Sequence, residues 1–120
     1  MRIAVYGAGA MGTILGAYIS RAGVPVDLIS RNEGHVAALN ARGAHIVGTV
    51  DFVQPVRALL PSQMQGEYDL IFLMTKQREN AQIAAFLRGY LRADGAVCTC
   101  QNGLPEPGLA AVLGADRVLG

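Results

Sequence analysis

The sequence predicts an α/β fold in which a doubly wound, mostly parallel sheet carries helices on both faces. Three observations carry this prediction. In the stretch 2–31, an apolar run, a glycine-rich turn, a helical pattern and a second apolar run follow one another. Similar strand-like and helix-like segments alternate along the rest of the 120 residues. Hydrophobic residues make up 52% of the chain without counting its 15 glycines, which favours strands that are buried on both faces.

The first unit of this fold is a strand, a helix and a second strand. The strand is expected over 3–6, because Ile-Ala-Val-Tyr is short and wholly apolar. The helix after it is expected to end at Gly23, and the second strand is expected over 24–30. The helical period places these residues on the expected buried face: Met11, Ile14, Leu15, Tyr18, Ile19 and Ala22.

The turn between the first strand and helix reads GAGAMG, which is a GxGxxG motif in the βαβ context of a Rossmann-like dinucleotide-binding fold. In such a turn Gly7 permits the tight bend, Gly9 lets the backbone approach a pyrophosphate, and Gly12 lets the helix pack on the strand. A turn that packs helix on sheet without any ligand is the alternative. The backbone N–H groups expected to face the phosphates are those of Ala8, Ala10, Met11 and Gly12.

The residue that follows the second strand indicates which dinucleotide binds. An NAD site usually has Asp or Glu about twenty residues past the glycines, where the carboxylate holds the ribose 2′-hydroxyl. This chain has Arg31 there, between Ser30 and Asn32. A guanidinium cannot accept a hydrogen bond from a hydroxyl, but it pairs with a 2′-phosphate. The sequence therefore favours NADP over NAD, and the alternative is that Arg31 is a solvated loop cation.

The next segment is expected to form a helix and a small antiparallel excursion. Asn32 is expected to cap the helix, which runs to Arg42 and ends at Gly43. Two short β-prone pieces, 45–47 and 51–53, lie on either side of a glycine and predict the excursion.

The remainder of the chain returns to alternating strands and helices. The segment 58–66 is expected to be a connection with at most one short helical turn, because it contains Pro61 and Gly66. The elements expected after it are a buried strand over 69–74, a helix over about 79–91, a strand over 96–100, a short helix over 106–113 and the start of a strand over 117–120.

Polar residues follow several of the expected strands. Because the carboxyl ends of parallel strands meet at one edge of a sheet, the glycine turn, Arg31, Thr75-Lys76 and Gln101-Asn102-Gly103 are expected to share that edge. Lys76 would supply a cation, and Asn102 a donor and an acceptor, beside a nicotinamide or its substrate. The alternatives are a solvated lysine at a helix entry and an ordinary Asn-Gly turn.

These motifs together resemble the ketopantoate reductase (2-dehydropantoate 2-reductase) family over the whole chain: GAGAMG, Arg31, LMTK ending at Lys76, and QNGL at 101–104. The resemblance implies NADPH-dependent reduction of 2-dehydropantoate (ketopantoate) to pantoate, on the way to pantothenate and coenzyme A. It implies that Lys76 and Asn102 act in catalysis by orienting and polarising the substrate. The cofactor-binding residues that it implies are Gly7, Ala8, Gly9, Ala10, Met11, Gly12, Arg31, Met74, Thr75, Lys76, Asn102 and Gly103.

Members of the resembled family continue into a mostly helical second domain, which carries the proton-donating lysine and most substrate contacts. Residues 1–120 are therefore expected to be an N-terminal NADP-binding domain that is truncated inside its sheet, with little turnover of its own. Gln77 and Pro105-Glu106-Pro107 depart from the family pattern and leave other substrates open. The alternatives are a reductase for another 2-keto acid or a lactone, and a non-catalytic NAD(P)-sensing module.

The charge and the apolar runs argue against nucleic acid and membrane partners. The formal net charge is +1 and no run of like charges occurs. No apolar stretch approaches the ~20 residues of a membrane-spanning helix, and the first residues already belong to the first strand rather than to a secretory signal. A cytoplasmic location is expected. A homodimer is a further possibility, because an unpaired final strand would leave an exposed edge.

The cysteines and histidines do not predict a metal site. Cys98 and Cys100 would point the same way along one strand, which is a poor geometry for a disulfide, and neither has another ligand at metal-binding spacing. Free buried thiols are expected. His35 and His45 are each expected to be a surface or cap residue rather than a catalytic base.

Overall fold

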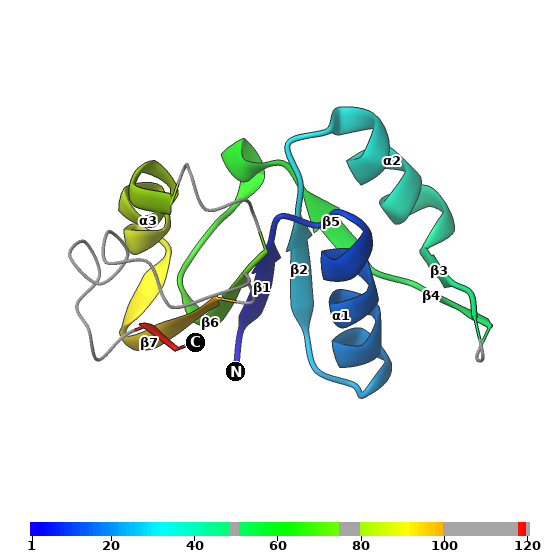
Figure 1. Ribbon diagram of the computed structural model, residues 1–120, viewed down its shortest axis with the longest axis horizontal. Coiled ribbons are helices and arrows are strands. Elements are labelled where there is room, and N and C mark those ends of the chain that lie inside the picture. The colour runs from blue at the N-terminus through cyan, green and yellow to red at the C-terminus, as the bar shows by residue number, and fades with distance from the viewer. Residues whose placement is uncertain (49–50, 75–79, 100–117, 120) are drawn as a thin grey trace.

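Six parallel strands form the central sheet of the computed structural model, which describes residues 1–48, 51–74, 80–99 and 118–119. The strands lie in the order β5-β2-β1-β6-β7-β8 (Figure 1). This order turns back at β1, as in the doubly wound dinucleotide-binding sheet, and confirms the expected fold class. The strand bounds are β1 Ile3–Tyr6, β2 Val26–Ile29, β5 Arg57–Leu59, β6 Tyr68–Leu73, β7 Leu91–Thr99 and β8 Val118–Leu119.

Helices cover both faces of this sheet (Figure 1). Helices α1 (Ala10–Arg21) and α2 (Glu33–Arg42) pack on one face, and α3 (Asn80–Arg88) packs on the other. Strand β1 shows why both faces are buried, because Ile3 and Val5 join the cluster under α1 and α2 whereas Ala4 and Tyr6 join the cluster under α3. All four residues of β1 are buried, as a two-sided apolar strand requires.

The buried face of α1 differs from the expected one. The helix buries Gly12, Gly16 and Ala17 against the sheet. The reason is close approach, since a Cβ on Gly16 would lie only 1.9 Å from a methyl carbon of Leu28 in β2. Small residues therefore face the strand. Four of the residues that were expected on the buried face are exposed instead: Met11, Ile14, Tyr18 and Ala22. That part of the prediction was wrong.

The segment after β2 matches the expectation closely. The side chain of Asn32 caps α2 by accepting a hydrogen bond from the backbone N–H of His35 (2.9 Å). Gly43 ends the helix with a φ of 79°, which favours glycine. Strands β3 (Ala44–Ile46) and β4 (Phe52–Gln54) then pair antiparallel beside α1.

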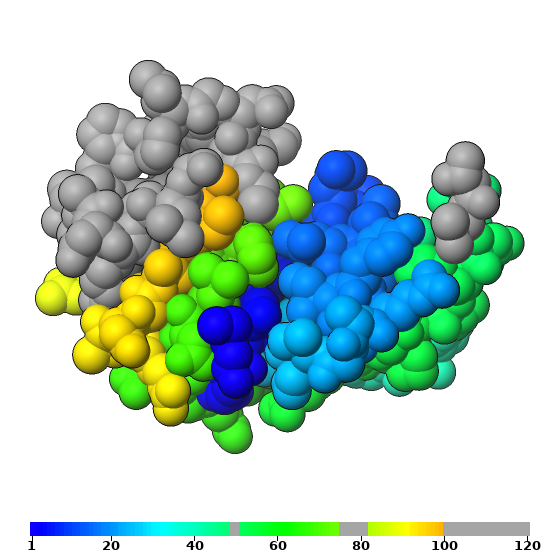
Figure 2. Space-filling model, turned by 90° about the horizontal axis from the view of Figure 1, so that it is seen from below, coloured from blue at the N-terminus to red at the C-terminus, as the bar shows by residue number. Residues whose placement is uncertain are grey.

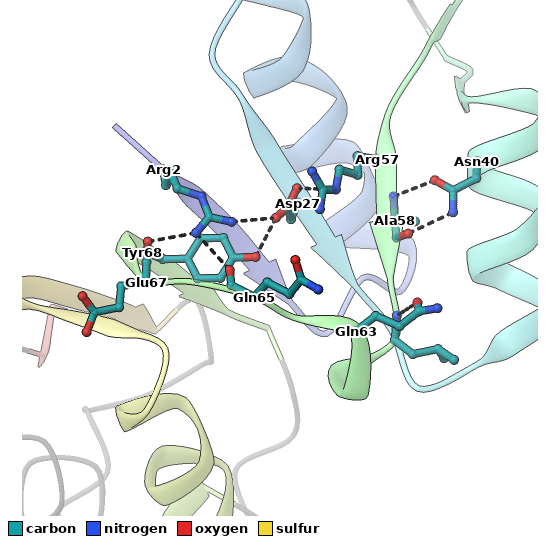
Figure 3. A network of polar contacts seen from close by, with 10 residues as sticks. Arg2, Asp27, Asn40, Arg57, Ala58, Gln63, Gln65, Glu67 and Tyr68 are labelled. Atoms are coloured by element: carbon teal, nitrogen blue, oxygen red, sulfur yellow. Dashed lines mark hydrogen bonds and ion pairs between the residues drawn. The ribbon is translucent and has the colours of Figure 1, made fainter.

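Strand β5 was not expected, because its segment was assigned to a connection. Arg57–Leu59 instead pairs parallel with β2, and only the turn of 3₁₀ helix η1 that follows it (Pro61–Gln63) agrees with the prediction. The outer side of this short strand is completed by a side chain. Asn40 of α2 accepts from the backbone N–H of Ala58 (2.8 Å) and donates to its carbonyl oxygen (2.9 Å), as Figure 3 shows. The sequence did not predict β5 because a strand of three residues is too short to show the alternation of polar and apolar residues that indicates a strand.

The second half of the sheet agrees with the expected order but not with every boundary. Strand β6 lies within one residue of the expected 69–74. Helix α3 ends at Arg88, earlier than expected, because Leu91 pairs with Tyr68 as the first residue of β7. Strand β8 pairs with β7, whereas the expected helix over 106–113 lies outside the described residues. Within the described parts of the chain, no helix combines the length and apolar character needed to cross a membrane.

Candidate functional site

The carboxyl ends of the central strands meet at one edge of the sheet. Tyr6 at the end of β1 is in register with Ile29 of β2 and Leu73 of β6. The backbone N–H of Met74 continues this ladder by donating to the carbonyl oxygen of Tyr6 (2.9 Å). The structure therefore brings the glycine turn, the segment that contains Arg31, and Met74 to the same edge (Figure 1). The other predicted site residues, Thr75, Lys76, Asn102 and Gly103, lie outside the described residues.

Two glycines of the turn are required by its geometry, and the third leaves space. Gly7 has a φ of 99°, which L side chains rarely adopt. A Cβ on Gly12 would lie 2.6 Å from the carbonyl oxygen of Gly7, so a side chain there would push helix and strand apart. Among the residues that the structure describes, a Cβ on Gly9 would meet no atom within 4 Å. The turn is therefore tightly packed on the sheet side and open beside Gly9.

The donors that the turn offers differ from the expected set at one position. The backbone N–H of Ala8 donates to the carbonyl oxygen of Ile29 (2.9 Å), which Gly7 also uses (3.0 Å). The expectation that this N–H faces a phosphate was wrong, because the last carbonyl of β2 lies beside the turn. Helix α1 begins immediately afterwards, and the N–H groups of its first turn have no acceptor within the helix. Those groups belong to Ala10, Met11 and Gly12.

Arg31 lies directly after β2 at the same edge. Its side chain is exposed, and the residues on either side of it are fixed. Ser30 donates its N–H to the carbonyl oxygen of Leu59 (3.0 Å), and its hydroxyl accepts from the N–H of Asn32 (3.1 Å). A guanidinium and three helix N-terminal N–H groups thus lie along one edge, and both are groups that bind phosphate oxygens.

His35 is a contact of the turn that sequence reasoning missed. Its ring nitrogen Nε2 lies 2.7 Å from the carbonyl oxygen of Ala8 and 3.4 Å from the hydroxyl oxygen of Thr13. The sequence places His35 in the first turn of a helix that starts at the site, but no local pattern states which loop the ring reaches. The ring also borders a hollow of about 450 Å³ between α1, α2 and the β3–β4 pair. Its lining residues are Thr13, His35, Ala38, Leu39, Arg42, Gly43, His45 and Val53.

Neither His45 nor Cys98 adds chemistry to this edge. His45 is exposed, and its Nε2 lies 2.9 Å from a carboxylate oxygen of Asp51. Cys98 is a partly buried free cysteine, and Cys100 lies outside the described residues. In the described ranges, no three His, Cys, Asp or Glu side chains gather as metal ligands would.

A polar network occupies the opposite edge, where the strands begin. The hydroxyl of Tyr68 donates to the carboxylate of Asp27 (2.6 Å), and the guanidinium groups of Arg2 and Arg57 lie 3.5 Å and 3.4 Å from that carboxylate (Figure 3). Figure 2 views this edge and shows the N-terminal residues between the segments of β6 and β2. Burial and the bond to Asp27 raise the pKa of Tyr68 well above its usual value. The network joins the starting ends of β1, β2, β5 and β6, and none of the predicted site residues belongs to it.

Asp69 lies at the same starting edge. Its carboxylate accepts from the backbone N–H of Arg2 (2.6 Å), which lowers its pKa, and the side chain of Arg92 (3.1 Å) lowers the pKa further. The ionised carboxylate therefore joins the start of β1 to the start of β6.

Asp69→Asn is expected to lower the free energy of unfolding at neutral pH, because the ionised acceptor is lost. A carboxyl whose folded pKa is depressed stabilises the fold above its ordinary pKa of 3.8, and that contribution disappears as pH falls through the folded pKa. Urea denaturation at pH 7 and at about pH 2 measures the difference between the two proteins. A difference that is equally large at both pH values would contradict this assignment.

Comparison with known proteins agrees with this architecture. The family model described as Ketopantoate reductase PanE/ApbA matches residues 3–120. The chain is 35% identical over 106 residues to a 2-dehydropantoate 2-reductase of Pyrococcus abyssi, which covers 87% of this chain and 34% of that protein. The crystal structure of 2-dehydropantoate 2-reductase from Geobacter metallireducens superposes with a TM-score of 0.86 at 31% identity, over 98% of this chain and 40% of that one.

A second solved structure carries ligands. The ternary structure of D-mandelate dehydrogenase with NADH and anilino(oxo)acetate superposes with a TM-score of 0.85 at 25% identity, over 98% of this chain and 39% of that one. The chain spans about a third of the length of the curated relatives it matches. Because the family model matches nearly every residue from Ile3 onward, the chain belongs to the ketopantoate reductase PanE/ApbA family.

Proposed function

We propose that residues 1–120 form one NADP-binding domain and are the cofactor-binding part of an enzyme that reduces 2-dehydropantoate to pantoate with NADPH. The observation that carries the proposal is the turn at the start of α1. It combines an open side at Gly9 with the N–H groups of the first helical turn, which have no acceptor within the helix and no side-chain cap. These features suit a pyrophosphate, because the backbone can approach closely and the helix dipole favours negative charge. Membership of the family supports the reaction.

Arg31 is the residue that we assign to the choice of cofactor. Its guanidinium follows β2, where a ribose 2′-phosphate lies in NADP sites of this fold. A guanidinium pairs with a phosphate through two parallel, charge-assisted N–H bonds, whereas a 2′-hydroxyl offers it only a neutral acceptor and finds no acceptor on it in return. The D-mandelate dehydrogenase structure that contains NADH supports a nicotinamide cofactor in general, and Arg31 supports NADPH in particular.

Each assigned residue has a separate task in this proposal. Bound NADPH supplies a hydride to the keto carbon of the substrate. The N–H groups of Ala10, Met11 and Gly12 hold the pyrophosphate, and Met74 and Thr75 flank the nicotinamide side. Lys76 orients the substrate and polarises its carbonyl, and the Asn102 amide donates and accepts hydrogen bonds there, with Gly103 beside it. The roles of Lys76 and Asn102 rest on the resemblance of LMTK and QNGL to the family motifs.

A second candidate is an NADP-dependent oxidoreductase that acts on another 2-keto acid. The superposition on D-mandelate dehydrogenase with anilino(oxo)acetate favours it, because that ligand also carries an oxo group beside a carboxylate. A panel of 2-keto acids, offered to the whole enzyme of which this chain is the proposed part, with NADPH oxidation followed by absorbance, distinguishes the two candidates. Ketopantoate as the substrate with the highest kcat/KM supports the first, and another acid preferred at least tenfold, about 1.4 kcal/mol, supports the second.

Arg31→Ala is expected to remove the preference for NADPH. Calorimetric titration of the unchanged chain should show NADPH binding at least tenfold tighter than NADH, about 1.4 kcal/mol. The substitution should weaken NADPH to the level of NADH and leave NADH unchanged, because only the 2′-phosphate contact is lost. Arg42→Ala is the matched control, since Arg42 is an exposed arginine at the other end of α2.

Two outcomes would contradict the proposal. One is a chain that shows the circular dichroism of a folded α/β protein and binds neither nucleotide. The other is an Arg31→Ala chain that keeps the full preference for NADPH, since the 2′-phosphate would then be held by other residues.

A further inference from the structure

The turn that carries the proposed site is held by a side chain from the neighbouring helix. Helix α2 presents His35 to the turn, and the imidazole nitrogen Nε2 lies 2.7 Å from the carbonyl oxygen of Ala8. A carbonyl oxygen only accepts hydrogen bonds, so Nε2 carries the proton and donates. The hydroxyl of Thr13 in α1 donates to the same oxygen at 3.3 Å. Two helices therefore hold one carbonyl group of the turn.

The two polar groups of Ala8 are fixed on opposite sides. Its N–H donates to the carbonyl oxygen of Ile29 in β2, while its carbonyl oxygen accepts from α1 and α2. The next residue, Gly9, is the cap of α1, and its carbonyl oxygen accepts from the N–H of Thr13 (2.9 Å). The orientation of the Ala8–Gly9 peptide therefore sets the direction in which the first N–H groups of α1 point.

His35 also belongs to the segment that follows Arg31. Its backbone N–H donates to the side chain of Asn32 (2.9 Å) and so fixes the start of α2. One side of the ring borders the hollow of about 450 Å³ between the helices and the β3–β4 pair, so packing does not enclose the imidazole. The bond to the carbonyl oxygen of Ala8 (2.7 Å) is shorter than the other polar contact of the ring, to the hydroxyl of Thr13 (3.4 Å).

We propose that His35 is a positioning residue for the dinucleotide, which acts by holding the carbonyl group of Ala8 in place. With this bond present, the Ala8–Gly9 peptide keeps the orientation in which the N–H groups of α1 converge on the pyrophosphate. Without it, the carbonyl oxygen keeps only the longer bond from Thr13, and the N–H of Gly9 keeps its bond to the carbonyl oxygen of Gly7 (2.9 Å). The peptide is then held less firmly, and the donors lose part of their common direction. This inference rests on the proposed function, because the pyrophosphate site belongs to it.

The position of the bond predicts how the two nucleotides respond. Both NADPH and NADH contain the pyrophosphate, so loss of the His35 bond should weaken both by the same factor. Loss of Arg31 should weaken NADPH alone. We expect His35→Leu to weaken each nucleotide about tenfold (~1.4 kcal/mol), with the ratio of the two dissociation constants unchanged.

Two further variants test the hydrogen bond rather than the size of the side chain. In His35→Gln the amide nitrogen takes about the place of Nε2 and can donate to Ala8, so affinity should return to within about threefold (~0.7 kcal/mol) of the unchanged chain. In His35→Asn the amide is too short to reach, so affinity should stay as low as in the leucine variant. His45→Gln is the matched control, because His45 lies in β3 and pairs with Asp51.

The measurement is calorimetric titration of each variant with NADPH and with NADH, after thermal unfolding shows that the variant is folded. The proposal is supported if His35→Gln restores affinity and His35→Asn does not, even if the leucine variant fails to fold. Equal affinities for those two variants overturn it, and so does a loss confined to NADPH. In both cases the unchanged chain still binds NADPH and the proposed function stands. If the unchanged chain is folded and binds neither nucleotide, the proposed function and this inference fail together.

Discussion

Gly9→Ala is expected to leave the fold intact and to weaken NADPH binding at least fivefold, about 1 kcal/mol. A Cβ at this position meets no atom of the described residues within 4 Å, and the φ of Gly9 is −79°, which alanine adopts readily. The added methyl group therefore costs the folded chain little. It does occupy the open side of the turn, where the proposed pyrophosphate approaches the backbone. Overpacking by one methyl group costs about 1–3 kcal/mol, which is roughly 5- to 150-fold in affinity.

Gly12→Ala is expected to behave differently, because its Cβ would lie 2.6 Å from the carbonyl oxygen of Gly7. Neither backbone can move without shifting α1 away from β1, so both the free energy of unfolding and the affinity for NADPH should fall. Gly89→Ala is the matched control. Gly89 follows α3 on the other face of the sheet, and its Cβ would make an ordinary contact of 3.7 Å.

Urea denaturation and calorimetric titration on the same samples separate these effects. The expected pattern is unchanged stability with lost binding for Gly9→Ala, and loss of both for Gly12→Ala. A Gly9→Ala chain that binds NADPH as tightly as the unchanged chain would mean that the cofactor does not approach the turn from its open side. The proposed site would then be wrong in its central contact.

The parts of the fold that the sequence predicted are those with local causes. The tight turn at Gly7 needs a positive φ, the cap at Asn32 needs a side-chain acceptor, and the helix end at Gly43 again needs a positive φ. Each requirement is met by one residue type at one position. The fold class followed from the same logic, because a βαβ unit that begins with a glycine turn is typical of a doubly wound parallel sheet.

The parts of the fold that the sequence did not predict depend on contacts between segments that are distant along the chain. Helix α1 turns its small residues inward because Leu28 lies beside Gly16, and a helical period cannot show that distance. Strand β5 exists because β2 offers a free edge and Asn40 closes the other side of Ala58. Likewise, the bond from His35 to the turn depends on the angle between two helices.

Tyr68→Phe is expected to lower the free energy of unfolding by about 2 kcal/mol at neutral pH. The substitution removes one hydroxyl, whose bond of 2.6 Å to Asp27 is the shortest contact of that buried carboxylate. Hydrogen bonds to charged groups contribute about 1.5–3 kcal/mol. Asp27 keeps the guanidinium groups of Arg2 and Arg57, so the carboxylate remains paired and the fold should persist.

The same bond predicts how stability depends on alkaline pH. Burial and the bond to Asp27 raise the pKa of Tyr68 in the folded state above its ordinary value of 10.0. Above pH 10 the unfolded chain therefore releases a proton that the folded chain retains, and stability falls as pH rises, by up to about 1.4 kcal/mol per pH unit. The stability difference between the unchanged chain and Tyr68→Phe is fully present below pH 10 and shrinks above it.

Urea denaturation of both proteins between pH 7 and about pH 11 measures this difference. Tyr18→Phe is the matched control, because Tyr18 is an exposed tyrosine whose ring contacts Phe52 edge-on, 5.4 Å between centroids. Its stability difference from the unchanged chain should be small. If Tyr68→Phe behaved like this control, the hydroxyl of Tyr68 would contribute nothing through Asp27. The network at the starting edge of the sheet would then consist of the two arginines and the carboxylate alone.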